Sequence, residues 1–166
     1  DYDRLRELTR TGDRFAIFGA GFIGSELAAA LAMNNKKVTM VFPEAAVGAL
    51  MLPAHLAQAL TQHYEQQGVT VLAGRKPAGV EIDQGVFGVQ LENGHMFSVD
   101  GVVAGLGIEP ETALAEGTGI EVDDGIVVDT YLRTEHPGIF AAGDVARFYN
   151  PQLNRSLRVE HEDNAL

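Results

Sequence analysis

Short runs of apolar, often β-branched residues recur along the chain. Arg14–Phe18 (RFAIF) stops at a glycine, and Lys37–Phe42 (KVTMVF) is of similar length. Nearly continuous apolar runs of this kind are typical of strands that are covered on both faces. We therefore expect strands at these two segments and at the four shorter runs that share their composition, which are Val69–Leu72, Gly101–Ala104, Ile126–Val128 and Ile139–Ala142.

Segments with helical spacing of apolar residues lie between these runs. Phe22–Asn34 (FIGSELAAALAMN) is rich in alanine and predicts a helix packed closely on a sheet. Ala54–Gln67 predicts a second helix, because a proline stands at its start and a glycine just past its end. Asp3–Thr11 is polar and predicts a short helix or a linker within residues 1–12, and Thr112–Glu116 predicts one helical turn.

The rhythm changes after the third strand. Gly79–Asp83, Val86–Leu91 and Met96–Val99 are short strand-like runs, separated by Gln84-Gly85 and Asn93-Gly94. A dipeptide such as Asn-Gly between two such runs is a strong hairpin signal. The sequence therefore predicts an α/β fold: a Rossmann-like three-layer domain with a parallel sheet, helices on one face and a small antiparallel three-stranded meander on the other.

Composition narrows the classes of partner. The formal net charge is −11, and the stretch from Glu81 to Glu135 holds twelve acidic residues and one basic residue. Such a surface repels phosphate backbones, so we expect no nucleic-acid partner. There is no apolar run of about 20 residues, so we expect no membrane span. The absence of cysteine excludes disulfides and thiolate metal sites within this chain.

The start of the chain is polar. Asp1–Arg4 contains no apolar signal core and no initiator methionine. We expect this sequence to be an internal piece of a longer cytoplasmic protein.

A glycine fingerprint joins the first strand to the next helix. Gly19, Gly21 and Gly24 form the pattern G-x-G-x-x-G, with Ala20, Phe22 and Ile23 between them. In a dinucleotide-binding turn the first glycine makes the turn, the second admits the pyrophosphate and the third allows close packing of helix and strand. Free N–H groups at the helix start then receive the phosphate charge. A glycine-rich turn that binds nothing is the alternative.

An acidic residue follows the second strand at the spacing of a ribose ligand. Glu44 lies in Val41–Glu44 (VFPE), about 20 residues beyond the glycines. A carboxylate here accepts hydrogen bonds from the two ribose hydroxyls and repels a 2′-phosphate. The nearest basic residues in the sequence, Lys36 and Lys37, precede the strand, so we expect NADH in preference to NADPH. A solvated turn glutamate is the alternative.

Other polar residues carry weaker signals. Glu26 lies in the first helical turn, where the helix dipole stabilises a carboxylate without any function. Gly143 and Asp144 end an apolar run; the glycine permits close approach of a ligand and the aspartate can accept from a sugar or ribityl hydroxyl, or simply cap the next turn. His161 stands among acidic residues that are consecutive in one segment, so we expect no metal site.

Together these segments resemble the NADH-binding domain of the FAD-dependent pyridine nucleotide oxidoreductases. The resemblance covers nearly the whole chain and is carried by Gly19–Glu26 (GAGFIGSE), the meander, Val103–Pro110 (VAGLGIEP) and Pro137–Asp144 (PGIFAAGD). Within this superfamily the chain is most similar to the apoptosis-inducing-factor and ferredoxin-reductase-like flavoproteins, through VFPE and Arg158–Asp163 (RVEHED).

The resemblance implies a division of the chain and a role for each candidate. Residues 1–128 would form the NADH-binding domain, and residues 129–166 the returning segment of an otherwise absent FAD-binding domain. Glu26 would lie near the nicotinamide, Gly107 would let the backbone pass beside it, and Glu44 would hold the adenosine ribose. The residues implied to contact the flavin or lie near it are Gly143, Asp144, Glu160 and His161.

The implied activity is the oxidation of NADH by hydride transfer to FAD, with an electron acceptor that the sequence does not identify. Most of the flavin site would lie outside this chain, so we expect the fragment alone to be inactive. Two alternatives stay open: an NAD(H)-sensing binding module, and a fragment of a disulfide reductase whose cysteine pair lies elsewhere. The sequence also leaves open whether the chain forms a homodimer.

Overall fold

A computed structural model describes residues 1–160 of the chain. The described residues form two compact units, Asp1–Gly107 and residues 108–160. The boundary predicted at residue 128 separates an NADH-binding part from an FAD-binding part, whereas the boundary after Gly107 separates two compact units. The boundary at residue 128 stays a prediction.

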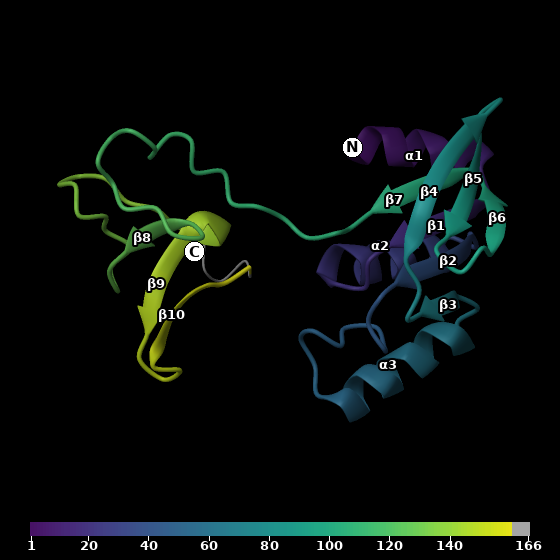
Figure 1. The fold of residues 1–166 in the computed structure, drawn as a ribbon, viewed down its shortest axis with the longest axis horizontal. Helices are drawn as coiled ribbons and strands as arrows, with labels where there is room; N and C mark the ends of the chain where they lie inside the picture. Colours follow the sequence, from purple (N-terminus) through teal and green to yellow (C-terminus); the bar gives the residue numbers. More distant parts are fainter. Residues whose placement is uncertain (161–166) are drawn as a thin grey trace. The chain divides into compact units, whose positions relative to one another are not determined.

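The first unit is built on a parallel sheet of four strands in the order β3-β2-β1-β7 (Figure 1). The strands are β1 (Arg14–Phe18), β2 (Lys37–Phe42), β3 (Thr70–Ala73) and β7 (Gly101–Ala104). Helices α2 (Phe22–Met33) and α3 (Ala54–Gln66) connect the first three strands, and α1 (Tyr2–Thr11) precedes β1. Each predicted element of this unit is present within one to two residues of its expected bounds.

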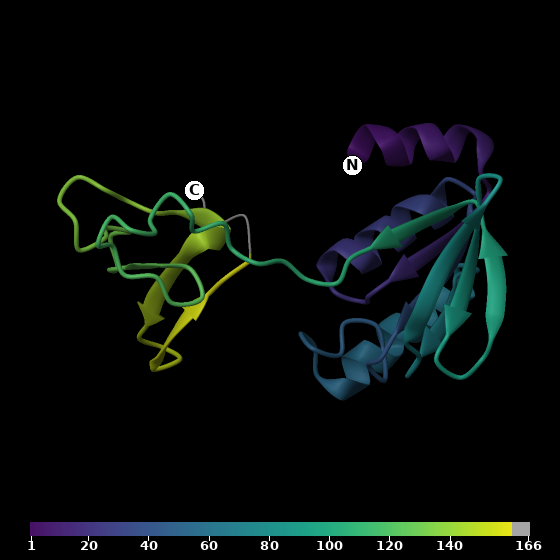
Figure 2. The same ribbon diagram turned by 45° about the horizontal axis from the view of Figure 1, so that its top comes forward.

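The two faces of the sheet carry different layers, because successive strand residues point to opposite sides. Phe15 and Ile17 pack with the helices, and the same cluster includes Leu31 of α2. Ala16 and Phe18 pack instead with Val89 and its neighbours on the meander. Both faces of β1 are therefore buried, as its unbroken apolar run predicts, and the three-layer Rossmann-like fold is confirmed (Figure 2).

The meander consists of β4 (Pro77–Asp83), β5 (Val86–Leu91) and β6 (Met96–Val99), in antiparallel order β4-β5-β6. At the first turn both Gln84 and Gly85 have positive φ, 47° and 83°. Two successive positive φ values define the type I′ turn that fits the twist of a hairpin. The predicted hairpins are confirmed.

Asp100 fastens the amino end of β1 to the start of β7. Its Oδ2 accepts hydrogen bonds from the N–H groups of Asp13 and Arg14, each at 2.9 Å, and its Oδ1 lies 2.6 Å from Arg14 Nη2. The Arg14 side chain and these two N–H groups hold the pKa of the Asp100 carboxyl well below its usual range.

Low pH is expected to weaken the interactions of the Asp100 carboxylate with Arg14 and with the Asp13 N–H group. Because the folded chain holds the Asp100 proton less tightly than the unfolded chain, the stabilisation is complete above the usual aspartate pKa of about 4 and is lost as the pH falls below it. The side chain is 26% exposed, so we expect about 1 kcal/mol or less. Urea denaturation from pH 7 to pH 2.5 should show a shallower loss of stability in Asp100→Asn than in the unchanged protein. The control is Asp83→Asn, at an exposed strand end; equal slopes in both variants would contradict the prediction.

The second unit contains a three-stranded sheet in the order β10-β9-β8. Its strands are β8 (Ile126–Val128), β9 (Ala146–Asn150) and β10 (Arg155–Arg158), and a 3-10 turn, η1 (Gly143–Val145), precedes β9. The strand expected at Ile126–Val128 is confirmed. β9 and β10 were not expected from the sequence.

The single helical turn expected at Thr112–Glu116 is confirmed, because Glu116 N–H donates to the Thr112 carbonyl at 3.2 Å, although the turn does not continue into a helix. One expectation for this unit is wrong. Ile139–Ala142 is not a strand, because it forms only one isolated bridge, between Phe140 and Arg133. Phe140 is 62% exposed, so this apolar run does not enter a sheet with layers on both sides.

Candidate functional site

Packing explains two of the three fingerprint glycines. Gly19 has φ of +102°, which side chains rarely allow, and a Cβ there would overlap the Gly105 carbonyl oxygen. A Cβ on Gly24 would overlap the Gly19 carbonyl oxygen. Gly19 is therefore needed for the turn to pack against the segment that follows β7, and Gly24 for α2 to pack against the turn itself, with or without a ligand.

Packing does not explain Gly21. It is the residue before the first helical position of α2, with φ of −77° and ψ of −166°, a conformation open to any residue. A Cβ at Gly21 would meet no atom of the chain within 4 Å. The missing side chain leaves open space outside the turn, which is the property that a closely approaching ligand requires.

Unused donors surround this space. Among residues 1–160 no hydrogen-bond acceptor is present for the N–H groups of Phe22, Ile23 and Gly24, since the first helical bond, from Ser25, uses the Gly21 carbonyl. The helix dipole adds partial positive charge at the same end. The start of α2 is thus suited to an anion such as a pyrophosphate.

A groove of about 290 Å³ lies over this turn. It brings together five of the predicted site residues, which are Gly19, Ala20, Gly21, Glu44 and Gly107. They come from the loops after β1, β2 and β7, whose carboxyl ends meet at one edge of the parallel sheet. Gly107 has φ of +102° and no atom within 4 Å of a Cβ position, so it also leaves open space.

Sequence reasoning missed the remaining wall of the groove. Part of this wall comes from the loop between β2 and α3, which contributes Pro43, Ala46, Ala49, Leu50 and Met51. The rest comes from two residues after β7, Gly105 and Leu106. Leu50 is 83% exposed, so the fold itself does not bury it. The position of Leu50, an apolar residue in a loop outside any predicted helix or strand, could have indicated this wall from the sequence.

Glu44 is half-buried at this edge. Its carbonyl oxygen accepts a hydrogen bond from Gly74 N–H at 2.9 Å, which fixes its backbone to the end of β3. Its carboxylate has no hydrogen bond or ion pair within residues 1–160 and so remains available. Lys36, which the sequence places near it, is held elsewhere by the Gly12 carbonyl at 2.8 Å and by Asp13 at 3.0 Å.

Four predicted site residues on α2 lie outside the lining of the groove, and one of them, Gly24, is buried. Phe22 and Ile23 are 53% and 49% exposed, and Glu26 is also exposed. The backbone amides of the first two residues still belong to the helix start. The Glu26 carboxylate makes no contact within residues 1–160 that assigns it a role.

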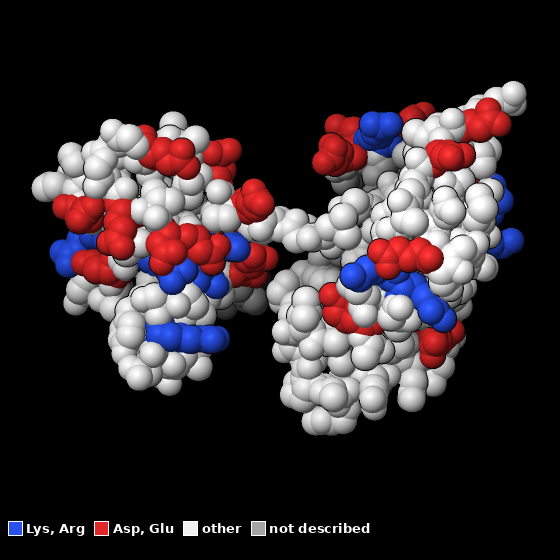
Figure 3. Space-filling view, viewed as in Figure 1, with Lys and Arg blue, Asp and Glu red and all other residues white. Residues whose placement is uncertain are grey.

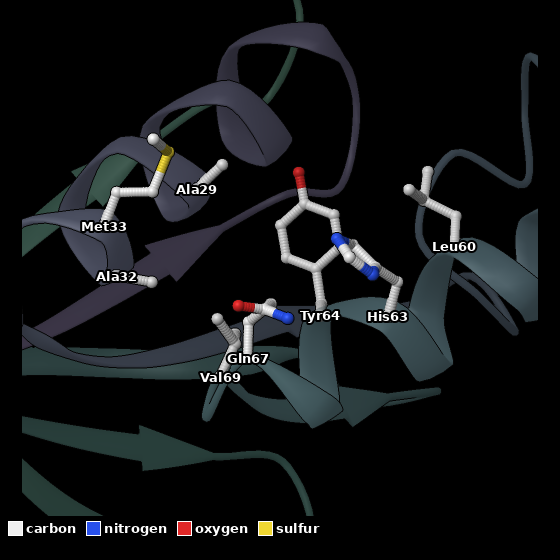
Figure 4. A pocket seen from close by; sticks show the side chains of 8 residues that line it. All are labelled: Ala29, Ala32, Met33, Leu60, His63, Tyr64, Gln67 and Val69. Carbon is white, nitrogen blue, oxygen red and sulfur yellow. The ribbon is translucent and has the colours of Figure 1, made fainter.

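A second cavity, of about 440 Å³, lies between α2 and α3. It is lined mainly by apolar side chains and contains none of the predicted site residues (Figure 4). Tyr64 rises from α3, and its hydroxyl donates to the Ser25 carbonyl at 2.9 Å. Burial raises the pKa of the Tyr64 phenol above its usual value. This cavity is part of the packing between two helices.

Tyr64→Phe is expected to lower the free energy of unfolding by about 0.5–1.5 kcal/mol, because the Ser25 carbonyl loses a donor in a partly buried place. Urea denaturation measures the change. Tyr2→Phe serves as the control, since Tyr2 is 72% exposed. If the two variants are equally stable, the bond between the helices contributes nothing.

The candidates for flavin contact lie in the second unit. Gly143 is buried with φ of +76°, and Asp144 is exposed, with a carboxylate that has no partner among the described residues. Glu160 Oε1 lies 2.9 Å from Arg158 Nη2. His161 lies outside the described residues.

Arg158 joins two of these candidates and was missed from the sequence. Its Nη1 donates to the Asp144 carbonyl at 3.3 Å while its Nη2 pairs with Glu160. Its side chain is only 10% exposed, and its Nε lies 3.5 Å from Asp124 Oδ1. Arg158 therefore fixes the Asp144 backbone and the Glu160 carboxylate relative to each other.

Two further classes of site are absent from the described part of the chain. No group of three or more histidine, aspartate and glutamate residues there could hold a metal ion. No helix within residues 1–160 has the length and apolar character to cross a membrane.

The chain is similar to known proteins over most of its length. The family model described as pyridine nucleotide-disulphide oxidoreductase matches residues 1–165. The seedling isozyme of monodehydroascorbate reductase from Cucumis sativus is 35% identical over 167 residues, which cover 98% of this chain and 38% of that protein. The nitric oxide reductase FlRd-NAD(+) reductase of Salmonella gallinarum is 36% identical over 146 residues, covering 88% and 39%.

Among solved structures, the ferredoxin reductase for the CYP199A2 system of Rhodopseudomonas palustris is similar with a TM-score of 0.90 and 29% identity. The match covers 98% of this chain and 41% of that one. This chain therefore spans about two fifths of the length of the relatives that it matches.

Proposed function

The chain belongs to the pyridine nucleotide-disulphide oxidoreductase family, and from this premise we propose that it is the NADH-binding part of a flavoenzyme that passes hydride from NADH to FAD. The single observation that carries the proposal is the open space at Gly21. The fold has no need of a glycine there, whereas a pyrophosphate lying on the start of α2 does.

The groove supplies the other parts of a dinucleotide site. The pyrophosphate would accept hydrogen bonds from the N–H groups at the start of α2, beside Gly21. The Glu44 carboxylate would accept from the two hydroxyls of the adenosine ribose, which favours NADH. Gly107, on the opposite wall, would let the nicotinamide half pass close to the backbone. Glu26 would face the nicotinamide end of the bound molecule.

The second unit supports the flavin half of the proposal. Asp144 presents a free carboxylate for a ribityl hydroxyl, and Gly143 before it has the positive φ that favours glycine. Glu160, held by Arg158, and His161 would lie near the flavin ring. When bound, NADH supplies the hydride and FAD accepts it, while the protein binds and orients the two cofactors.

The electron acceptor of the whole protein stays unassigned. The three relatives are named for monodehydroascorbate, for FlRd and for a ferredoxin, which are acceptors of different kinds.

Titration of the purified 166-residue chain with NADH tests the proposal. We expect saturable binding of one NADH per chain by calorimetry, no yellow flavin in the purified protein, and no NADH turnover with an artificial electron acceptor. No detectable binding at millimolar NADH would refute the proposed site. Bound flavin together with turnover would refute only the expectation that this fragment is inactive.

The sequence upstream of this chain in the coding region distinguishes the proposed flavoenzyme from the two alternatives, an NAD(H) sensor and a disulfide reductase. A second glycine fingerprint upstream in the coding region supports the flavoenzyme. A cysteine pair there supports a disulfide reductase, and the absence of both supports an NAD(H) sensor.

A further inference from the structure

Two cationic side chains lie at the end of β3, beside the proposed ribose site. Arg75 and Lys76 are the only Lys or Arg residues in the segments that directly follow the four parallel strands. β3 pairs with β2, with Phe42 opposite Ala73. The Arg75 N–H donates to the Phe42 carbonyl at 2.9 Å, so the backbone at Arg75 lies next to the segment that carries Glu44.

These two side chains are free to take an anion. Both are exposed, and neither forms an ion pair or a side-chain hydrogen bond within residues 1–160, although the chain is strongly acidic. By contrast, Arg14 and Lys36 in the same unit pair with Asp100 and Asp13. Figure 3 shows Lys and Arg side chains gathered around the end of β3 and the start of β4, with acidic side chains beside them.

A cavity of about 340 Å³ lies in front of this pair. Its lining consists of Pro43, Gly74, Arg75, Lys76, Glu92 and Asn93. Pro43 also lines the dinucleotide groove, so the two spaces share a wall. Glu92 offsets one of the two positive charges, and Asn93 adds a neutral amide.

We propose that Arg75 and Lys76 form a subsite for the 2′-phosphate of NADPH, so that this protein binds NADPH as well as NADH. The inference rests on the proposed function, because it needs the adenosine ribose to lie at Glu44. Neighbouring strands of a sheet lie about 4.8 Å apart, so the end of β3 is close to the end of β2, where Glu44 would bind the ribose. A 2′-phosphate on that ribose, directed toward β3, would therefore reach Arg75 and Lys76. Arginine and lysine are the side chains best suited to a phosphate dianion.

Glu44 and the Arg75–Lys76 pair then act in opposite directions. The Glu44 carboxylate binds the ribose hydroxyls of NADH and repels a 2′-phosphate, while the pair attracts it. The ratio of NADH to NADPH affinity is therefore set by two neighbouring strand ends rather than by the β2 loop alone. Glu44→Gln should raise the affinity for NADPH and lower it for NADH.

Calorimetric titrations of the 166-residue chain with NADH and with NADPH test this assignment. The double variant R75Q/K76Q should bind NADPH about tenfold more weakly or worse, since it loses charged partners of the phosphate. Its affinity for NADH should stay within about twofold. The control is R6Q/K37Q, which removes two exposed and unpaired positive charges from α1 and from the first residue of β2.

Each outcome decides the assignment. Selective loss of NADPH affinity in R75Q/K76Q supports it. An equal loss for both cofactors, the same loss in R6Q/K37Q, or no NADPH binding at millimolar concentration overturns it while leaving the proposed NADH site intact. Failure of the unchanged chain to bind either cofactor overturns the proposed function together with this inference.

Discussion

Gly21→Val is expected to weaken NADH binding by at least about 100-fold, or ~2.7 kcal/mol, while leaving the fold intact. The valine side chain would enter the open space above the turn, where the pyrophosphate is proposed to lie. It would also screen the free N–H groups at the start of α2. The fold should tolerate the change, because a Cβ there meets no atom within 4 Å and the backbone conformation is extended.

Calorimetry measures the binding, and urea denaturation measures the fold. Gly79→Val is a matched control: Gly79 lies on β4, does not line the groove, and a Cβ there also meets no atom within 4 Å. We expect this control to bind NADH like the unchanged protein. Unchanged affinity in Gly21→Val would mean that the glycine fingerprint does not hold the cofactor. A loss of stability comparable to the loss of binding would leave the glycine with a structural role only.

The sequence predicts the first unit well because its local and long-range signals agree. The apolar run of β1 is unbroken after Arg14, and only Thr39 interrupts that of β2; both faces of the sheet are covered, so burial follows directly from the pattern. The turn at Gln84-Gly85 needs two residues with positive φ, and its composition indicates this without any tertiary information.

The second unit shows where such reasoning ends. Ile139–Ala142 has the composition of a strand, but one bridge to Arg133 is its only sheet-like pairing in the described residues. Conversely, β9 (ARFYN) and β10 (RSLR) mix charged and apolar residues, and they become strands through pairing with each other and with β8. Strand pairing is a long-range property, and short mixed segments carry little local signal for it.

The candidate site divides in the same way. Gly19, Gly21 and Glu44 could be identified from spacing, because a parallel sheet brings the loops after its strands to one edge. Arg75 and Lys76 are more than 30 positions beyond the end of β2, which Glu44 follows, and only the pairing of β3 with β2 brings them beside it. Arg158 could not be predicted as a site residue, because its role depends on contacts with Asp144 and Glu160 that the sequence does not reveal.

The second large effect is expected at Glu44, where replacement by alanine should weaken NADH binding by about 1–3 kcal/mol, roughly 5- to 150-fold. This is the cost of removing a charged acceptor from two ribose hydroxyls. The effect on stability should be small, because the carboxylate has no partner in the described part of the chain. The fold depends there on the Glu44 carbonyl, which accepts from Gly74 N–H and is unaffected by the substitution.

Comparison with Glu65→Ala separates this effect from a general change of charge. Glu65 is an exposed residue of α3 whose carboxylate also lacks a partner among residues 1–160, and it does not line the groove. Calorimetric titration should therefore give Glu65→Ala an NADH affinity within about twofold of the unchanged protein. A second titration with a nicotinamide mononucleotide, which lacks the adenosine half, should be insensitive to Glu44→Ala. Equal weakening of both ligands would place Glu44 outside the ribose site, because only the adenosine ribose distinguishes its proposed contact from a long-range effect of charge.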